Sequence, residues 1–293
     1  MAFQGIAVHH GGRSMAMQPD EELAAMNEYA IRGMQSIPLS RGHRYVTKQF
    51  SGNRGMRVIF RKLGQNEDEH WLNHFAALIT AYLLPPYNKP PYSNNCHTEL
   101  VMDIAPGCTV RIGTMFKFAE KNEAGETVWK PGKAFVSEIS EGELAKYETL
   151  LMPSTREMET RMLCFALRNL GAPFHETAYK MRALFPITPG VSAYDPVAND
   201  VRNKEYAIPK MWCTNHTVLC LQAAAYEKLR CLRAGQMMVP SDSVWNTGWE
   251  STIMDQNATG HTPNKLYYLL KSLSDVRVAG SRPDQRFRNV GTL

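Results

Sequence analysis

Apolar residues recur at helical spacing in five segments of the chain, and this pattern predicts five helices. In residues 154–170 an apolar stripe follows an N-cap at Ser154, and Gly171 stands where the helix would end. Residues 213–235 show the same spacing and close on Gly235. The predicted helices cover residues 20–34, 67–84, 154–170, 213–235 and 263–273.

Four other segments are rich in β-branched and aromatic residues, which favour strands. Residues 97–104 and 109–118 flank a short Ala-Pro-Gly-Cys turn, a spacing typical of an antiparallel hairpin. The predicted strands cover residues 56–63, 97–104, 109–118 and 133–139.

The composition is that of an ordinary folded protein, with 293 residues, of which 44% are hydrophobic and 21% charged. The longest strongly apolar stretch, residues 75–84, is shorter than the roughly 20 residues that span a bilayer, so no transmembrane segment is expected. A stretch rich in proline and turn formers follows at 85–95. We therefore predict three parts, which are an accessory region at 1–90 beginning with a flexible arm, a catalytic domain at 91–275, and a basic tail at 276–293.

The formal net charge of +5 is spread along the chain and diluted by acids, which predicts weak nucleic-acid binding at most. The N-terminus lacks the pattern of a secretory signal, and the six cysteines show no CxxC pair, as expected for reduced thiols in a cytoplasmic setting. His70 and His74 form a helical i, i+4 pair without the glutamate of an HExxH motif. We expect no metal site and no cofactor.

Cys213 stands at the start of the predicted helix 213–235. A thiol becomes a strong nucleophile once it loses its proton, and the free N–H groups and dipole at a helix N-terminus favour that loss. Cys220 and Cys231 lie further along the same helix, where buried thiols act as small apolar residues. Cys213 is therefore the predicted nucleophile.

A thiol nucleophile needs an imidazole that takes its proton and returns one to the leaving group. His97 opens the predicted strand 97–104 directly after a turn-rich segment, so its side chain can stand at the mouth of a sheet. His216 follows Cys213 by three residues on the same helix and has less freedom to face it. We predict His97 as the base, with His216 and His175 as the next candidates.

The order of these motifs, HTEL at a strand start and then WCTNHTVLCLQ at a helix start, resembles the circularly permuted NlpC-like branch of the papain-like fold. Residues 171–174 (GAPF) and 263–267 (PNKLY) extend the likeness over roughly residues 92–272, and it is greatest to members from large DNA viruses. The resemblance implies an α+β papain-like fold, with an antiparallel sheet packed on helices and the histidine strand before the cysteine helix. It also implies that cysteine is the nucleophile and histidine the base.

In that family a polar residue of the following strand orients the imidazole. Here that strand carries Thr109, Arg111 and Thr114 in place of a His, Asn or Gln. Glu99 shares a side of its strand with His97 and is the alternative orienting residue. The predicted catalytic set is therefore Cys213, His97 and Glu99.

These residues predict a thiol hydrolase, which could be a peptidase, an amidase, or an acyl hydrolase or acyltransferase. Its substrate would be a peptide, an isopeptide or an acyl lipid. Aromatic residues between Phe174 and Phe185, together with Trp245 and Trp249, are candidates for lining an apolar cleft, with core packing as their alternative role.

A second interpretation belongs to another class of function. The long N-terminal extension, the basic termini and the unusual third catalytic position also suit a viral structural or interaction protein, such as a minor capsid component. Such a protein would retain a papain-like scaffold and bind other virion proteins. The location expected from the two interpretations is cytoplasmic or virion-associated.

Overall fold

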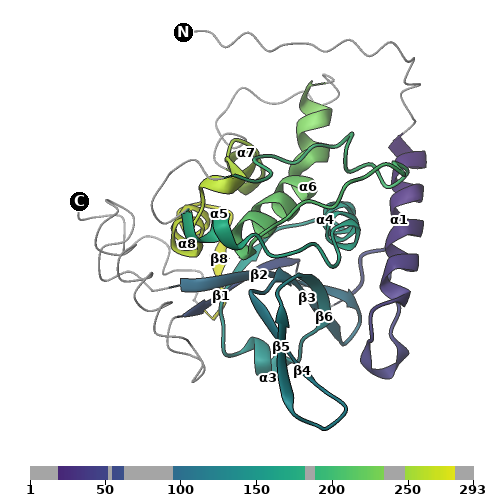
Figure 1. Cartoon of the computed structure of the whole chain (residues 1–293). Coiled ribbons are helices and arrows are strands. Elements are labelled where there is room, and N and C mark those ends of the chain that lie inside the picture. The colour runs from purple at the N-terminus through teal and green to yellow at the C-terminus, as the bar shows by residue number, and fades with distance from the viewer. Residues whose placement is uncertain (1–18, 52–54, 63–94, 182–188, 234–247, 281–293) are drawn as a thin grey trace.

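The computed structural model describes residues 19–51, 55–62, 95–181, 189–233 and 248–280 (Figure 1). Within them a six-stranded antiparallel sheet packs against helices, so the predicted α+β class is confirmed. The strands of this sheet are β1 (Met56–Lys62), β2 (Asn95–Ala105), β3 (Cys108–Thr114), β6 (Ala134–Glu138), β7 (Glu148–Met152) and β8 (Arg277–Val278). They lie in the order β6-β3-β2-β1-β7-β8.

The described helices include three long ones and several short ones. They are α1 (Pro19–Gln35), α3 (Glu141–Leu144), α4 (Arg156–Arg168), α5 (Glu176–Met181), α6 (Cys213–Arg233), α7 (Trp249–Met254) and α8 (Pro263–Lys271), with 3₁₀ turns η1 (Ser40–Gly42) and η2 (Ala258–Gly260). Of the five segments predicted to be helices, 20–34, 154–170 and 263–273 lie within the described residues, and 213–235 does so as far as residue 233. Each of these four contains a helix near the expected bounds.

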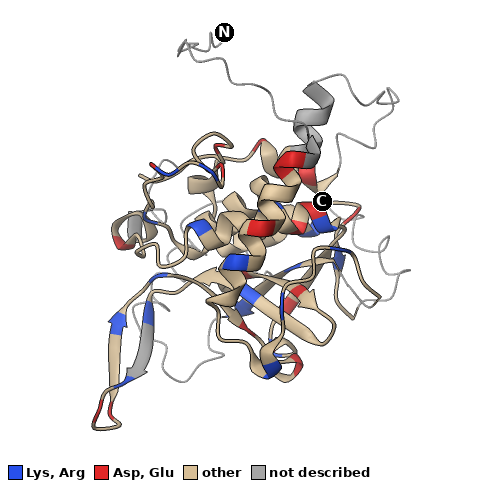
Figure 2. Ribbon diagram, turned by 90° about the vertical axis from the view of Figure 1, so that its right-hand side faces the viewer, with Lys and Arg blue, Asp and Glu red and all other residues tan. Residues whose placement is uncertain are grey.

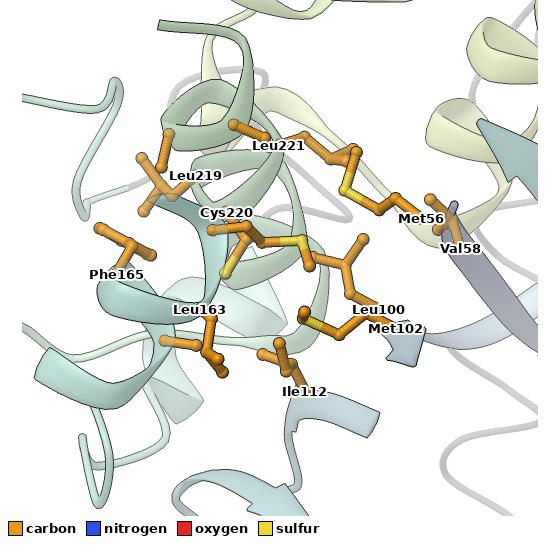
Figure 3. Packing of buried hydrophobic residues seen from close by; sticks show 14 of the residues in the cluster. Met56, Val58, Leu100, Met102, Ile112, Leu163, Phe165, Leu219, Cys220 and Leu221 are labelled. Atoms are coloured by element: carbon orange, nitrogen blue, oxygen red, sulfur yellow. The ribbon is translucent and has the colours of Figure 1, made fainter. Parts of the chain in front are cut away.

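Helices α4 and α6 pack side by side against the sheet, and α1 packs against α4 (Figure 1). Leu221 and Cys220 of α6 belong to the same buried apolar cluster as Leu100 and Met102 of β2 (Figure 3). Burying one such leucine side chain stabilises a fold by about 1.5–3 kcal/mol. This apolar interface therefore holds α6 firmly against β2, the strand that carries His97.

The predicted hairpin of residues 97–118 forms, but its second strand is interrupted. Gly107 makes the turn between β2 and β3 with a φ of 73°. β3 ends at Thr114, and the chain then forms a separate two-stranded sheet of β4 (Lys117–Lys121) and β5 (Thr127–Pro131). A Cβ at Gly132 would lie 1.9 Å from the Met115 carbonyl oxygen, so this crossing requires glycine. The β4–β5 hairpin projects away from the main sheet (Figure 2).

The N-cap of α4 is Thr155 and not the predicted Ser154. The Thr155 side chain accepts a hydrogen bond from the Met158 amide. Ser154 Oγ instead accepts one from the Met56 amide at 2.9 Å and donates one to Glu159 at 2.7 Å. Ser154 thus ties the start of β1 to α4.

Strand β1 comes from the part of the chain that the sequence assigned to an accessory region. It lies between β2 and β7 and pairs with both, so it is an inner strand of the main sheet. Its five residues 56–60 are buried, and alternate side chains face the two sides of the sheet. The expected accessory position therefore does not hold for residues 56–62.

Several other predictions fall on parts of the chain that the structure does not describe. These are the arm at 1–18, the helix at 67–84 with His70 and His74, Phe185, Trp245, and the tail from 281 onward. Over the described ranges, no helix combines the length and the apolar character needed to cross a membrane.

Candidate active site

The first residues of strand β2 include two of the predicted site residues. His97 and Glu99 are two positions apart, so their side chains leave the strand on the same side. His97 Nε2 lies 2.8 Å from Glu99 Oε1, a normal hydrogen-bond distance. Both side chains are buried, so little water competes for this contact.

The segment that leads into Cys213 is attached to the sheet through a short ladder beyond β6. Phe174 forms a parallel bridge with Met211. The Met211 amide donates to the Pro173 carbonyl at 3.1 Å, and the Met211 carbonyl accepts from His175 at 2.8 Å. Because Met211 precedes the thiol by two residues, these bonds fix where Cys213 begins its helix.

Cys213 is the first residue of α6, as predicted, and the first turn of that helix contains no acidic residue. The N–H groups of a first helical turn have no acceptor within the helix, and they favour negative charge nearby. The Cys213 side chain also lies beside His97, and its interaction with the imidazole raises the pKa of His97. The chain thus brings Cys213, His97 and Glu99 together from α6 and β2. Since Nε2 of His97 is taken by Glu99, Nδ1 is the nitrogen left for the thiol.

The charges around His97 favour its protonated form. Burial lowers the pKa of His97, but the hydrogen bonds and charges of Cys213 and Glu99 outweigh burial and raise it to about 9. Burial acts in the opposite direction on Glu99, yet its contact with His97 and the charges of Arg111 and Arg61 hold the pKa of Glu99 below its ordinary value. The arrangement is a carboxylate, an imidazolium and a thiol in sequence.

Arg111, which the sequence offered as a candidate for the third position, acts on Glu99 and not on His97. Its Nη1 lies 4.0 Å from Glu99 Oε2 and 2.8 Å from Glu143 Oε1, while its Nε donates to Ser137 Oγ at 3.1 Å. The guanidinium therefore supports the Glu99 carboxylate from strand β3. Thr109 is used elsewhere, since its hydroxyl donates to Asp103.

His216 and His175, the next candidates for the base, lie elsewhere and make other contacts. His216 is buried, and its Nδ1 lies 2.9 Å from Thr114 Oγ1. Burial lowers the pKa of His216 to about 4, so it is neutral near pH 7. His175 accepts a hydrogen bond from the Ala178 amide at 3.4 Å, and its ring lies edge-on to Trp212 with centroids 6.1 Å apart.

The other buried thiols have environments that disfavour the thiolate. Burial raises the pKa of Cys164 to about 12 and that of Cys108 to about 11, and it raises the pKa of Cys220 well above its ordinary value. Cys96 is half-buried and donates weakly to the Arg61 carbonyl at 3.5 Å. Cys213 differs from these four because an imidazolium lies against it.

The aromatic residues named as cleft candidates divide between core and surface. Trp249 is fully buried, and its Nε1 donates to the Pro153 carbonyl at 3.0 Å, so it packs in the core. Phe174 makes an edge-on contact with Phe116, with centroids 5.4 Å apart. Phe116 is 43% exposed and stands at the base of the β4–β5 hairpin.

Sequence reasoning missed one residue that shapes this site, Gly113, and considered Thr114 only for the position that orients His97. Gly113 of β3 lies under the Glu99 side chain, whereas Thr114 contacts His216. The signal for Gly113 was a glycine inside a predicted strand, which indicates close approach by another group. Across the described part of the chain, no three or more His, Cys, Asp or Glu side chains gather as they would around a metal ion.

Comparison with protein-family models gave no matching family, and comparison with curated protein sequences and with solved structures gave no match either.

Proposed function

We propose that the chain is a cysteine hydrolase or acyltransferase, with Cys213 as nucleophile, His97 as acid and base, and Glu99 as the group that orients His97. The observation that carries this proposal is that His97 interacts with Cys213 and is hydrogen-bonded to Glu99 at 2.8 Å. A nucleophile, a base and an orienting acceptor in mutual contact form the arrangement that covalent acyl transfer requires.

In the first step the Cys213 thiolate attacks a carbonyl carbon, a C–S bond forms, and the carbonyl π electrons move to oxygen. In this proposal, N–H groups of the first turn of α6, which begins at Cys213, stabilise that oxyanion. The tetrahedral species collapses, the bond to the leaving amine or alcohol breaks, and His97 gives its proton to the leaving group. A water, deprotonated by His97, then attacks the thioester and releases the acid and the Cys213 thiolate. Another acyl acceptor in place of water gives transfer.

The order of the elements along the chain also supports the proposal. An antiparallel sheet carries His97 on β2, and a helix that begins with Cys213 comes later in the chain. This order agrees with a circularly permuted papain-like fold of the NlpC-like type, which we include in the proposal. Peptide, isopeptide and acyl-lipid carbonyls all suit the chemistry of the three residues.

An acyl-trapping experiment tests the proposal without knowledge of the natural substrate. The purified chain is mixed with an activated aryl ester, and peptide mapping locates any acyl group on a thiol. We expect acylation of Cys213 and loss of it in Cys213→Ala. Cys96→Ala is the matched control, because Cys96 is a half-buried thiol next to His97 in sequence. Acylation spread over several thiols, or unchanged in Cys213→Ala, would contradict the proposal.

Substitution of His97 tests the part of the proposal that assigns His97 as the acid and base. His97→Ala removes proton transfer and should lower turnover by roughly 10²–10⁴-fold. Far-ultraviolet circular dichroism checks that the variant remains folded. A folded His97→Ala variant with an undiminished rate would assign the base to another residue.

One observation favours the second candidate, a structural or virion-interaction protein that keeps the scaffold without turnover. Cys213 is 2% exposed and His97 9% exposed, which leaves little surface for a substrate to contact. In that case Cys213 would resist acylation in the folded protein and acylate only after denaturation. The trapping experiment therefore separates the two candidates.

A further inference from the structure

His216 is buried on the first turn of α6, three residues after Cys213. Its Nδ1 lies 2.9 Å from the hydroxyl of Thr114, the last residue of β3. One side chain of the nucleophile helix is therefore bonded to the second residue of the dipeptide Gly113-Thr114 of the sheet.

The same dipeptide contacts the other half of the candidate site. Glu99 of β2 packs over Gly113, and Glu99 holds His97 through the 2.8 Å contact. Gly113 thus contacts Glu99, and the next residue, Thr114, bonds to His216. A movement of α6 relative to β3 would change the separation between Cys213 and the pair His97 and Glu99.

Apolar packing holds α6 on the sheet, and a directional contact adds a restriction on that separation. The contact of α6 with the sheet consists largely of aliphatic side chains, and such burial is favourable but non-directional. A hydrogen bond restricts distance and angle much more narrowly. His216 supplies a directional contact of this kind, its hydrogen bond to Thr114, within one helical turn of Cys213.

We propose that His216 is a positioning residue, which holds the first turn of α6 in register with Gly113 and Thr114 and so sets Cys213 against His97. This inference rests on the proposed function of Cys213. His216 stays neutral near pH 7 because burial lowers its pKa to about 4, so it positions without exchanging protons there.

The test compares three variants of the full chain. His216→Phe keeps a ring but removes the hydrogen bond to Thr114, whereas His216→Asn retains a polar side-chain group near the place of Nδ1. His261→Asn is the matched control, because His261 is also 1% exposed with a pKa lowered to about 4, mainly by burial. Thr114→Val removes the hydroxyl partner with little change of shape, and it serves if His216→Phe does not fold.

The first readout is the rate at which a small alkylating agent modifies Cys213 between pH 5 and 9. Displacing Cys213 from His97 should move the inflection upward, and one pH unit of movement lowers the rate at pH 6 by about tenfold. We expect this loss in His216→Phe, a smaller one in Thr114→Val, and substantial recovery in His216→Asn. His261→Asn should lower the denaturation midpoint but leave the profile unchanged. An unchanged profile in His216→Phe, with loss of stability only, would overturn the inference.

A second readout separates failure of this inference from failure of the proposed function. The imidazole of His97 is titrated by NMR in each variant, since its raised pKa reports contact with Cys213 and Glu99. If wild-type Cys213 reacts like an ordinary thiol, the proposed function fails, yet a lower His97 pKa in His216→Phe would still support positioning. An unchanged His97 pKa in that variant would refute it.

Discussion

Glu99 packs so closely against Gly113 that a Cβ at position 113 would lie 2.8 Å from Glu99 Cγ. Gly113 does not have a positive φ, so it is needed for space and not for backbone conformation. Because Cγ is close to the backbone of Glu99, rotation of the far end of the side chain cannot relieve the contact. We predict that Gly113→Ala displaces the carboxylate from His97, slows Cys213 alkylation and costs about 1–3 kcal/mol of stability.

Denaturant unfolding and the alkylation rate measure the two effects of Gly113→Ala. Gly142→Ala is the matched control, since a Cβ at that position would meet no heavy atom within 4 Å. If Gly113→Ala changes the Cys213 alkylation rate and the free energy of unfolding no more than Gly142→Ala does, the close contact between Glu99 and Gly113 does not support the site.

A second prediction concerns the alkaline limit of activity. His97 must carry a proton to protonate the leaving group, and its pKa of about 9 places the descending limb of turnover near that pH. Glu99→Gln removes a charge that raises the His97 pKa, so this limb should move to lower pH. The measurement is turnover against pH from 6 to 10 in both proteins. A limb that stays in place would remove Glu99 from its orienting role.

Acid stability provides a third prediction. Burial lowers the pKa of both His216 and His261 to about 4, so between about pH 6.5 and 4 the unfolded chain binds protons that the folded chain does not. Stability should therefore fall as pH decreases through this window, by about 3 kcal/mol at most per histidine. Thermal unfolding of His261→Asn should show a shallower fall. If the thermal stability of His261→Asn falls as steeply with decreasing pH as that of the wild type, His261 does not cause part of the fall.

His97 acts on stability with the opposite sign. Its pKa is higher in the folded chain than the unfolded value near 6.5, so its contribution is fully present below about pH 6.5 and lost as pH rises towards about 9. Thermal unfolding between pH 6.5 and 9 should therefore show a decline that His97→Ala reduces. A decline of equal size in that variant would place its cause elsewhere.

The positions of Cys213 and His97 could be predicted because each depends on local sequence. Cys213 begins a long apolar pattern, and His97 begins a β-rich run after a turn-forming segment, so both element starts are visible in the chain. Glu99 followed from the two-residue repeat of a strand. These inferences need no knowledge of which elements pack together.

Other features depend on contacts distant in sequence and could not be predicted. β7 was missed because its five residues Glu148–Met152 become a strand through pairing with β1 and β8. The break after Thr114 depends on Gly132 crossing the chain there. The bond between His216 and Thr114 spans 102 residues and exists only once α6 has packed against β3.

The most direct test of the account is the pH dependence of Cys213 alkylation in the wild type and in His97→Ala. Because an imidazolium lies against the thiol, Cys213 should react with an inflection between about pH 3.5 and 7.5, whereas a free thiol titrates near about 8.5. His97→Ala should move the inflection upward by removing that charge, and peptide mapping assigns each modified thiol. If folded Cys213 is inert, or titrates like a free thiol with no change in His97→Ala, the chain does not contain an activated cysteine.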